Sequence, residues 1–291
     1  MTPITPEVHQ VPQQIEPIRL QEYGVGIFQS CATKSALKKA IKANRITVND
    51  RLAQTATIIS GGEIIVYTPE IQKKSQRKFQ LELQVIYEDE VLAAIHKPAG
   101  VLVSGNSFKT IANALAQNLT PSQYKDATQP HPVHRLDYAT TGVLLIGKTK
   151  SSIRLLNKLF EENRVQKTYY AITMGSMSSN GSITDAIDGK PAHTNYEVAS
   201  SVTSQRFGTL NLLRIRLESG RRHQIRKHLA GIGNPILGDR DYSEPSQLLK
   251  GKGMYLHAYS IAFPHPETNE HVTLIDPLPG RFGKIFPNYT D

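Results

Sequence analysis

The chain of 291 residues carries 34 Lys and Arg against 25 Asp and Glu, which gives a formal net charge of +9 and a pI of about 9.5. This length allows one sizeable core plus a small accessory domain, and the positive surplus favours a polyanionic partner such as RNA or DNA. The single cysteine, Cys31, excludes internal disulfides and cysteine-ligated zinc. No apolar run approaches the roughly 20 residues that a membrane-spanning helix needs. We therefore expect a cytoplasmic protein with no membrane contact.

The N-terminal part divides by composition. Residues 1–19 are rich in Pro and Gln and poor in apolar residues, which predicts a flexible tail. Residues 20–70 have the pattern of a small α/β module, with short strands expected at residues 46–50 and 63–67. Residues 71–82 form a basic polar stretch, interpreted as a linker to a larger domain at residues 83–291.

A cationic helix is expected inside the small module, from Lys34 to Arg45. Its apolar residues recur with helical spacing and would face the module's core. Three cations follow at i, i+4 and i+7 and would share another face: Lys38, Lys42 and Arg45. A solvated surface or an RNA-backbone clamp could carry such a stripe, because Lys and Arg neutralise phosphates.

The larger domain mixes short strands and helices without a regular strand–helix alternation. Strands are expected at residues 85–87, 91–96, 142–147, 167–174 and 210–217, and a helix at residues 151–162. This order predicts an α+β fold with a mixed, mainly antiparallel central sheet flanked by helices.

Asp137 lies between the strand-like residues 133–136 and the apolar residues 143–146. A carboxylate at such a junction is partly desolvated and needs a positive partner or hydrogen bonds to stay ionised. Taken by itself, an Asp in this place is more often part of an Asx turn or a helix cap than a catalytic group.

A cationic segment at residues 219–230 can supply the positive partner. If a helix starts near Arg222, then Ile225 and Leu229 face the core, while Arg222 and Arg226 share another face. A planar guanidinium pairs bidentately with a carboxylate, so we expect one to hold Asp137 ionised. A phosphate clamp without chemistry would use the same residue types.

A metal site is the other chemistry to weigh. His131, His134 and Asp137 are spaced by three, and further histidines follow near residue 223. So many guanidinium groups disfavour a metal ion electrostatically, and no second carboxylate is expected near Asp137. A Gly-x-Ser-x-Gly nucleophile elbow is also absent from the sequence. We therefore expect no metal ligands and no serine-hydrolase chemistry.

The motifs of residues 83–280 resemble those of the RluA family of pseudouridine synthases. The signature is His134-Arg135-Leu136-Asp137 followed by Thr140-Thr141-Gly142. The other family segments follow in order: Lys97-Pro98-Ala99-Gly100, Lys167-Thr168-Tyr169-Tyr170-Ala171, Gly220-Arg221-Arg222-His223-Gln224-Ile225-Arg226 and Pro235-Ile236-Leu237-Gly238-Asp239-Arg240-Asp241-Tyr242. Thr141 stands where serine is usual, and Ser219 where threonine is usual; both keep a hydroxyl.

The small module resembles the RNA-binding domain named after ribosomal protein S-four. Lys34-Ser35-Ala36-Leu37-Lys38, Arg45-Ile46-Thr47-Val48-Asn49 and Gly61-Gly62-Glu63-Ile64 carry this resemblance. The module departs from the usual pattern at residues 24–28, where an arginine-leucine-aspartate opening is replaced.

The family resemblance implies the conversion of uridine to pseudouridine in structured RNA, without a cofactor because no atoms are gained or lost. It implies that Asp137 is the catalytic carboxylate, that Arg226 pairs with it, and that Tyr169 stacks on uracil near the carbon-5 proton. Asp137 would either attack the ribose or remove a proton from its carbon 2. Arg135 would help to hold the RNA open, and the remaining expected RNA-binding residues of this domain are Arg221, Arg222 and His223.

Several functional hypotheses remain at this point. Large-subunit ribosomal RNA is the expected substrate, because the N-terminal module is most similar to that of the ribosomal enzymes; tRNA is the alternative. A non-catalytic RNA-binding or ribosome-assembly protein would not need Asp137, Arg226 and Tyr169 together. A metal-dependent hydrolase would bind metal and be sensitive to chelators. The chain is expected to act as a monomer.

Overall fold

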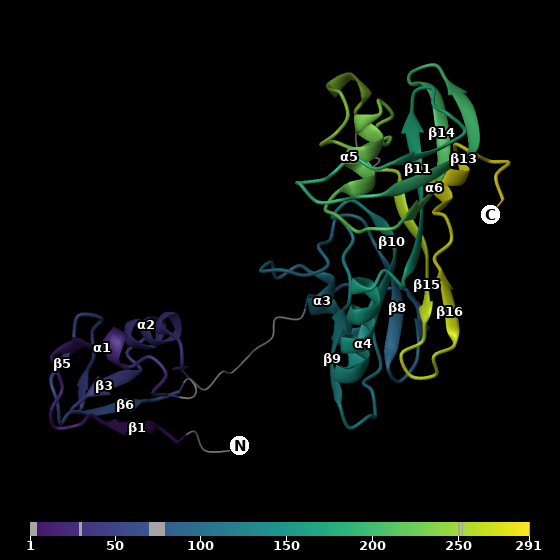
Figure 1. The fold of residues 1–291 in the computed structure, drawn as a ribbon. Helices are drawn as coiled ribbons and strands as arrows, with labels where there is room; N and C mark the ends of the chain where they lie inside the picture. Colours follow the sequence, from purple (N-terminus) through teal and green to yellow (C-terminus); the bar gives the residue numbers. More distant parts are fainter. Residues whose placement is uncertain (1–4, 29–30, 70–78, 250, 252, 291) are drawn as a thin grey trace. The chain divides into compact units, whose positions relative to one another are not determined.

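The structure, a computed structural model, describes residues 5–28, 31–69, 79–249, 251 and 253–290 (Figure 1). The chain forms two compact units, Met1–Gln76 and Arg77–Asp291, which we call the N-terminal unit and the catalytic unit. Most of the expected basic linker, residues 71–78, lies outside the described residues. Within the part of the chain that the structure describes, no helix is both long and apolar enough to span a bilayer.

The N-terminal unit is a small α/β module with its own core. Its four-stranded antiparallel sheet has the order β1 (Glu7–Gln10), β6 (Ile64–Tyr67), β3 (Ile46–Val48) and β4 (Arg51–Leu52). A second ladder joins β2 (Ile18–Arg19) to β5 (Ile58–Ile59), and the helices are α1 (Leu20–Tyr23) and α2 (Lys34–Lys42). Leu37, Ile46 and Ile65 are completely buried between α2 and the sheet.

The expected flexible tail at residues 1–19 is wrong where the structure describes it. Glu7–Gln10 pairs with Ile64–Tyr67 as the edge strand of the sheet, and Ile18–Arg19 pairs with β5. Val11 is 1% exposed in the core. Strand pairing is stabilised by backbone hydrogen bonds to a distant partner, so a polar composition does not exclude it.

The cationic helix is shorter than expected. Helix α2 begins after Thr33, whose hydroxyl accepts a hydrogen bond from the N–H of Ala36, and it ends at Lys42. Asn44 has a positive φ of 55°, which turns the chain into β3. Lys38 and Lys42 therefore share a helix face, whereas Arg45 lies beyond the helix and the expected three-cation stripe is wrong for this residue.

The catalytic unit is built on a 10-stranded sheet with the main order β12-β13-β14-β11-β15-β10-β8-β7; β9 pairs with β10, and β16 with β15. The strands are β7 (Val85–Glu88), β8 (Leu92–Lys97), β9 (Ala127–Pro132), β10 (Thr141–Thr149), β11 (Gln166–Met174), β12 (Asn180–Ile183), β13 (Thr194–Ser204), β14 (Gly208–Leu217), β15 (Leu256–Pro264) and β16 (His271–Ile275). The pair β10–β15 is parallel and the other ladders are antiparallel. The expected mixed, mainly antiparallel α+β fold is confirmed.

Helices cover parts of this sheet (Figure 1). They are α3 (Ile111–Ala114), α4 (Lys150–Glu161), α5 (Gln224–Gly231) and α6 (Gly280–Gly283). Every residue of β10 is buried because the strand has neighbours on both sides and α4 packs against it. This explains why residues 143–146 form a continuous apolar run rather than alternating.

Two sequence expectations near the site need correction. The expected strand at residues 133–136 is irregular: β9 ends at Pro132, and Val133 adds one more backbone hydrogen bond to β10, to the carbonyl of Leu145 at 3.1 Å, before the chain bends. The helix expected to start near Arg222 begins at Gln224, after His223 adopts a left-handed conformation with φ 56°. Arg222 and Arg226 therefore do not share a helix face.

Gly142 allows the close approach of β10 to β15. Its φ is +122°, and a Cβ atom at this position would lie 2.2 Å from the carbonyl oxygen of Ala258. Only glycine fits such a conformation and contact without a shift of the backbone. This parallel pairing places the loop that carries Asp137 beside the starts of both strands.

Candidate active site

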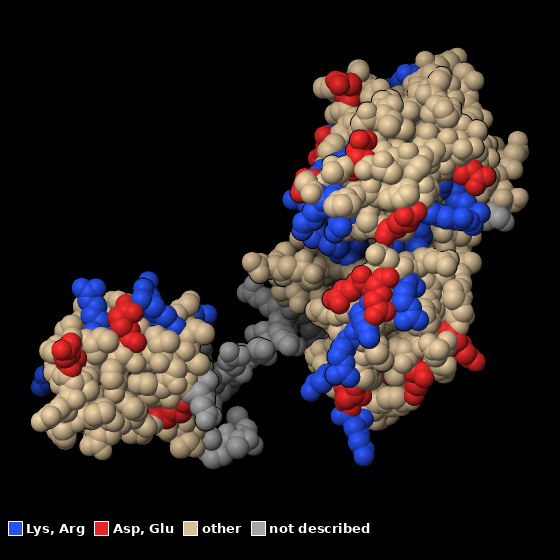
Figure 2. Space-filling view, in the orientation of Figure 1, with Lys and Arg blue, Asp and Glu red and all other residues tan. Residues whose placement is uncertain are grey.

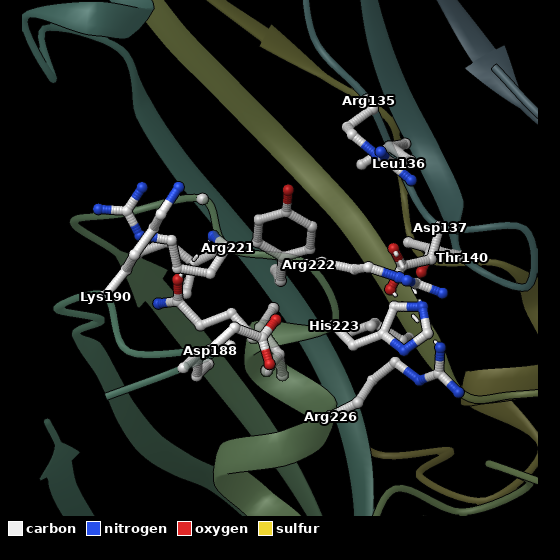
Figure 3. Close-up of a pocket in the computed structure, with 17 residues that line it drawn as sticks. Arg135, Leu136, Asp137, Thr140, Asp188, Lys190, Arg221, Arg222, His223 and Arg226 are labelled. Carbon is white, nitrogen blue, oxygen red and sulfur yellow. Dashed lines mark hydrogen bonds and ion pairs between the residues drawn. The ribbon is translucent and has the colours of Figure 1, made fainter. Parts of the chain in front are cut away.

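A cavity of about 360 Å³ lies where the loop after β9 meets β11 and the start of α5 (Figure 3). All the site residues expected in the catalytic domain line it: Arg135, Asp137, Tyr169, Arg221, Arg222, His223 and Arg226. The cavity also takes in Asp188 and Lys190, from the connection between β12 and β13, which sequence reasoning missed. Lys38, Lys42 and Arg45 belong to the N-terminal unit.

The Asp137 loop is held by a buried lysine. The ammonium group of Lys97, at the end of β8, donates to the carbonyls of Pro98 at 2.9 Å, Tyr138 at 3.3 Å and Thr140 at 2.9 Å. Burial lowers the pKa of Lys97 to about 8, against the opposing attraction of Asp137. In the sequence, Lys97 stands out only as part of a family motif. Its contacts with the carbonyls could not be predicted, because the sequence does not show that carbonyls of distant residues converge on its ammonium group.

The Asp137 carboxylate is largely shielded from solvent, with its side chain 16% exposed. Its nearest basic neighbours are the Arg226 guanidinium, whose Nη1 lies 3.7 Å from Oδ2, and the His223 imidazole, whose Nε2 lies 3.8 Å from Oδ1. Figure 3 shows both side chains pointing toward the carboxylate. Both contacts are longer than hydrogen bonds, so they supply charge compensation without covering the oxygens.

Arg226 makes its bidentate pair with Asp239 and not with Asp137, which corrects the expected geometry. Its Nε and Nη2 donate to the two oxygens of Asp239 at 2.6 and 2.7 Å, and Nη2 also donates to Asp241 at 2.6 Å. Burial pulls the pKa of Arg226 down, but the hydrogen bonds to Asp239 and Asp241 outweigh it and raise the pKa above its usual value. Arg226 therefore stays charged beside Asp137.

Asp239 is the main site residue that sequence reasoning missed. It is 1% exposed and fixes the plane of the Arg226 guanidinium. The expectation that no second carboxylate lies near Asp137 is also wrong, because Asp239 and Asp241 contact the same guanidinium. Among the described residues, no group of three or more His, Cys, Asp or Glu side chains is arranged to hold a metal ion.

His223 forms part of the cavity wall at the start of α5. Its Nδ1 lies 2.9 Å from the hydroxyl of Tyr242, and its ring packs edge-on against the tyrosine. Burial lowers the pKa of His223, which the neighbouring Asp137 partly opposes. The left-handed conformation of His223 directs its side chain to the cavity while the helix behind it remains regular.

His134 does not face Asp137. Its Nε2 accepts the backbone N–H of Leu145 at 2.9 Å, and its ring stacks on Phe160 with centroids 5.0 Å apart. Burial and, to a smaller degree, Lys167 lower the pKa of His134 to about 3, so the ring is neutral. His134 therefore anchors the loop to β10 and α4.

Tyr169 projects from β11 into the cavity and is 9% exposed. Burial raises the pKa of its phenol, and the charge of Asp137 raises it further. The ring is therefore a neutral, flat surface beside the carboxylate, which suits contact with a planar base.

A carboxylate beside an aromatic ring, with guanidinium groups around it, is the arrangement expected of an enzyme that acts on nucleic acid. Comparison with known proteins agrees. The family model for RNA pseudouridylate synthase matches residues 91–231. The chain is 32% identical to ribosomal large subunit pseudouridine synthase D of Vibrio cholerae, covering 85% of this chain and 84% of that one. It is 31% identical to synthase D of Pasteurella multocida, covering 92% of each chain.

A solved structure extends the agreement to the fold. Human RNA pseudouridylate synthase domain containing 4 superposes with a TM-score of 0.54 and 27% identity, covering 68% of this chain and 90% of that chain. This chain belongs to the RluA family of RNA pseudouridine synthases, isomerases that convert uridine to pseudouridine in RNA.

Proposed function

We propose that Asp137 is the catalytic carboxylate, with Arg226 and Tyr169 as its partners in the cavity. The proposal rests on how Asp239 and Asp137 contact the Arg226 guanidinium. Asp239 takes the bidentate hydrogen bonds of the guanidinium, while Asp137 lies 3.7 Å away. Asp137 therefore has a fixed positive neighbour, and its oxygens remain accessible to a substrate in the cavity.

The reaction needs one ionised carboxylate. The bond from ribose carbon 1 to uracil nitrogen 1 breaks, the base turns, and carbon 1 bonds to carbon 5, which loses its proton while nitrogen 1 gains one. Asp137 either attacks carbon 1 of the ribose or removes the proton from carbon 2 to give a glycal. No atom is gained or lost, so no cofactor is needed. Tyr169 stacks on the uracil next to the carbon-5 proton.

The cations around the cavity bind the RNA backbone. Arg135, Arg221, Arg222 and Lys190 line the cavity, and the His223 ring adds a hydrogen-bonding group to them. A uridine in structured RNA must be extruded to reach Asp137, at a cost of a few kcal/mol that phosphate contacts offset. Arg135, two residues before Asp137, holds the opened RNA.

The proposed substrate is large-subunit ribosomal RNA. This rests on the relatives, which are named ribosomal large subunit pseudouridine synthase C and D. Residues 20–70 act as an S-four-like RNA-binding domain with Lys38, Lys42 and Arg45 as backbone contacts. Figure 2 supports this role, since Lys and Arg side chains gather on the N-terminal unit where Figure 1 places α2. The enzyme acts as a cytoplasmic monomer.

Pseudouridine mapping tests the catalytic assignment and the substrate together. Ribosomal RNA and tRNA from cells with and without the gene are compared, and the gene is then restored as wild type, as Asp137→Asn, or as the control Asp50→Asn in an exposed turn of the N-terminal unit. We expect a site in large-subunit rRNA that wild type and control restore and Asp137→Asn does not. Full restoration by Asp137→Asn would disprove the catalytic assignment, and a site found only in tRNA would disprove the substrate.

A further inference from the structure

A second cavity adjoins the first. It is lined by Ala99, Gly100, Tyr138, Ala139, His223, Arg226, Gly238, Asp239, Arg240, Asp241, Gly253 and Met254. His223 and Arg226 line both cavities, so these two side chains form the wall between them. Asp137 and Tyr138 are neighbours in the chain, yet Asp137 lines the first cavity and Tyr138 the second. The second cavity thus adjoins the candidate active site across these two side chains.

Tyr138 combines a fixed backbone with an exposed ring. Its carbonyl oxygen accepts from the N–H of Gly100 at 2.8 Å and from the Lys97 ammonium at 3.3 Å. Nevertheless 57% of the residue is exposed. The Tyr138 hydroxyl lies close to Gly100: a Cβ atom added to this glycine would lie 3.9 Å from the hydroxyl oxygen. A large aromatic ring held open to solvent beside an RNA site is the usual platform on which an unpaired base stacks.

The charges of the second cavity favour a neutral ring over a phosphate. Asp239 and Asp241 lie on this side of Arg226, and the oxygens of both accept hydrogen bonds from its guanidinium. Ala99, Ala139 and Met254 add apolar surface. The exposed Arg240 lines the same cavity and suits the phosphate that would link a base there to its neighbour.

We propose that this second cavity binds the base of the nucleotide next to the target uridine, stacked on Tyr138. The inference rests on the proposed function, because it requires the target uridine to occupy the first cavity. It makes Tyr138 a specificity-determining residue: the enzyme recognises a uridine whose neighbour can also leave its stack. Only one of the two neighbours, the 5′ or the 3′ nucleotide, places its base in the second cavity.

The test removes the ring and the base separately and together. The probe is a stem-loop oligoribonucleotide with the sequence around the mapped uridine, made intact or with a base-free ribose at the 5′ or the 3′ neighbour. Single-turnover rate constants at subsaturating enzyme are measured for wild type, Tyr138→Ala and Tyr138→Phe. Tyr124→Ala is the matched control, because Tyr124 is 41% exposed and lines neither cavity.

We expect base removal at one neighbour to slow wild type by roughly tenfold or more, the range of a lost base–aromatic stack. Tyr138→Ala should lower the rate constant on the intact probe by a similar factor. Removing the base should then lower the rate constant of this variant by less than about twofold more, because the ring on which the base stacks is already gone. Tyr138→Phe and Tyr124→Ala should behave as wild type. Equal effects of base removal in wild type and Tyr138→Ala, or none at either neighbour, overturn the inference. If wild type fails to convert the intact probe, the proposed function itself fails.

Discussion

Arg226 and Lys97 of the catalytic unit are buried and held by several partners, whereas Lys38 and Lys42 of the N-terminal unit reach solvent. In the catalytic unit, Arg226 is 6% exposed and shared between Asp239 and Asp241, and Lys97 is completely buried among three carbonyls. In the N-terminal unit, Lys42 is exposed on α2 and Lys38 is half-buried. A buried cation with several partners cannot move, so it fixes the geometry of its neighbours. An exposed cation keeps its mobility and its hydration until RNA arrives.

This difference predicts two kinds of energetic effect. Removing one member of a buried ion pair leaves the other charge uncompensated and is strongly destabilising, whereas an exposed pair contributes about 0–1 kcal/mol. Exposed cations instead change RNA affinity and its dependence on salt. Variants of the buried cations should therefore change mainly the stability of the fold, and variants of the exposed cations mainly the affinity for RNA.

The largest effect is expected for Arg226→Met. Asp239 would remain buried without its partner, so the free energy of unfolding should fall by about 3–5 kcal/mol, and isomerisation should be lost. Urea unfolding of the full chain measures the first and a single-turnover assay the second. The matched control is Lys158→Met, which breaks the exposed pair with Glu162 and should change stability by about 0–1 kcal/mol.

The double variant Arg226→Met/Asp239→Asn separates stability from chemistry. Neutralising Asp239 should recover most of the lost stability without restoring isomerisation, because Asp137 still lacks its positive neighbour. If Arg226→Met lowered the free energy of unfolding no more than Lys158→Met, the proposed difference between buried and exposed cations would be wrong.

Lys97→Met is expected to slow isomerisation by roughly 100-fold. The carbonyls of Pro98, Tyr138 and Thr140 would lose their common donor, and the loop that carries Asp137 would shift. Displacements of about 1 Å at a reacting group have effects of that size. Single-turnover rates at saturating RNA measure the loss, and RNA affinity should change little. A rate within twofold of wild type would mean that Lys97 does not position the loop.

Lys97 should also leave a signature in the dependence of stability on pH. Burial lowers its pKa from 10.5 to about 8 in the folded chain, so between these values the unfolded chain binds more protons than the folded one. The free energy of unfolding of wild type should therefore rise relative to Lys97→Met between about pH 8 and 10.5, by at most about 1.4 kcal/mol per pH unit. A difference that stays flat or falls over this window would contradict the burial of a charged Lys97.

The smallest effect is expected for Lys38→Ala/Lys42→Ala in the N-terminal unit. Two phosphate contacts would be lost, so RNA binding should weaken several-fold and the slope of log affinity against log salt should shrink by about 1.4–1.8. The rate at saturating RNA should not change. Titrations at several salt concentrations measure the slope, with Lys125→Ala/Lys158→Ala as a control that removes the same charge from exposed positions of the catalytic unit. Equal slopes for the two variants would show that α2 does not contact the backbone.

Local patterns in the sequence predicted much of the catalytic unit. The apolar runs that became β8, β10, β11 and β14 were placed correctly, since burial on both faces leaves a continuous hydrophobic segment. Strand β13 was not predicted, because most of its residues from Glu197 onward are polar and its partner β14 holds it by backbone pairing. Edge strand β1 was missed for the same reason.

The sequence by itself determined the family and singled out the candidate site residues, because the motifs around Asp137, Tyr169 and Arg226 keep their order and spacing along the chain. Only the tertiary structure decided which charges pair. Arg226 lies in reach of three carboxylates, and the distances assign its bidentate bonds to Asp239 and a looser ion pair to Asp137. Such choices depend on how β10 pairs with β15 and where α5 begins, and these are set by packing between segments far apart in sequence.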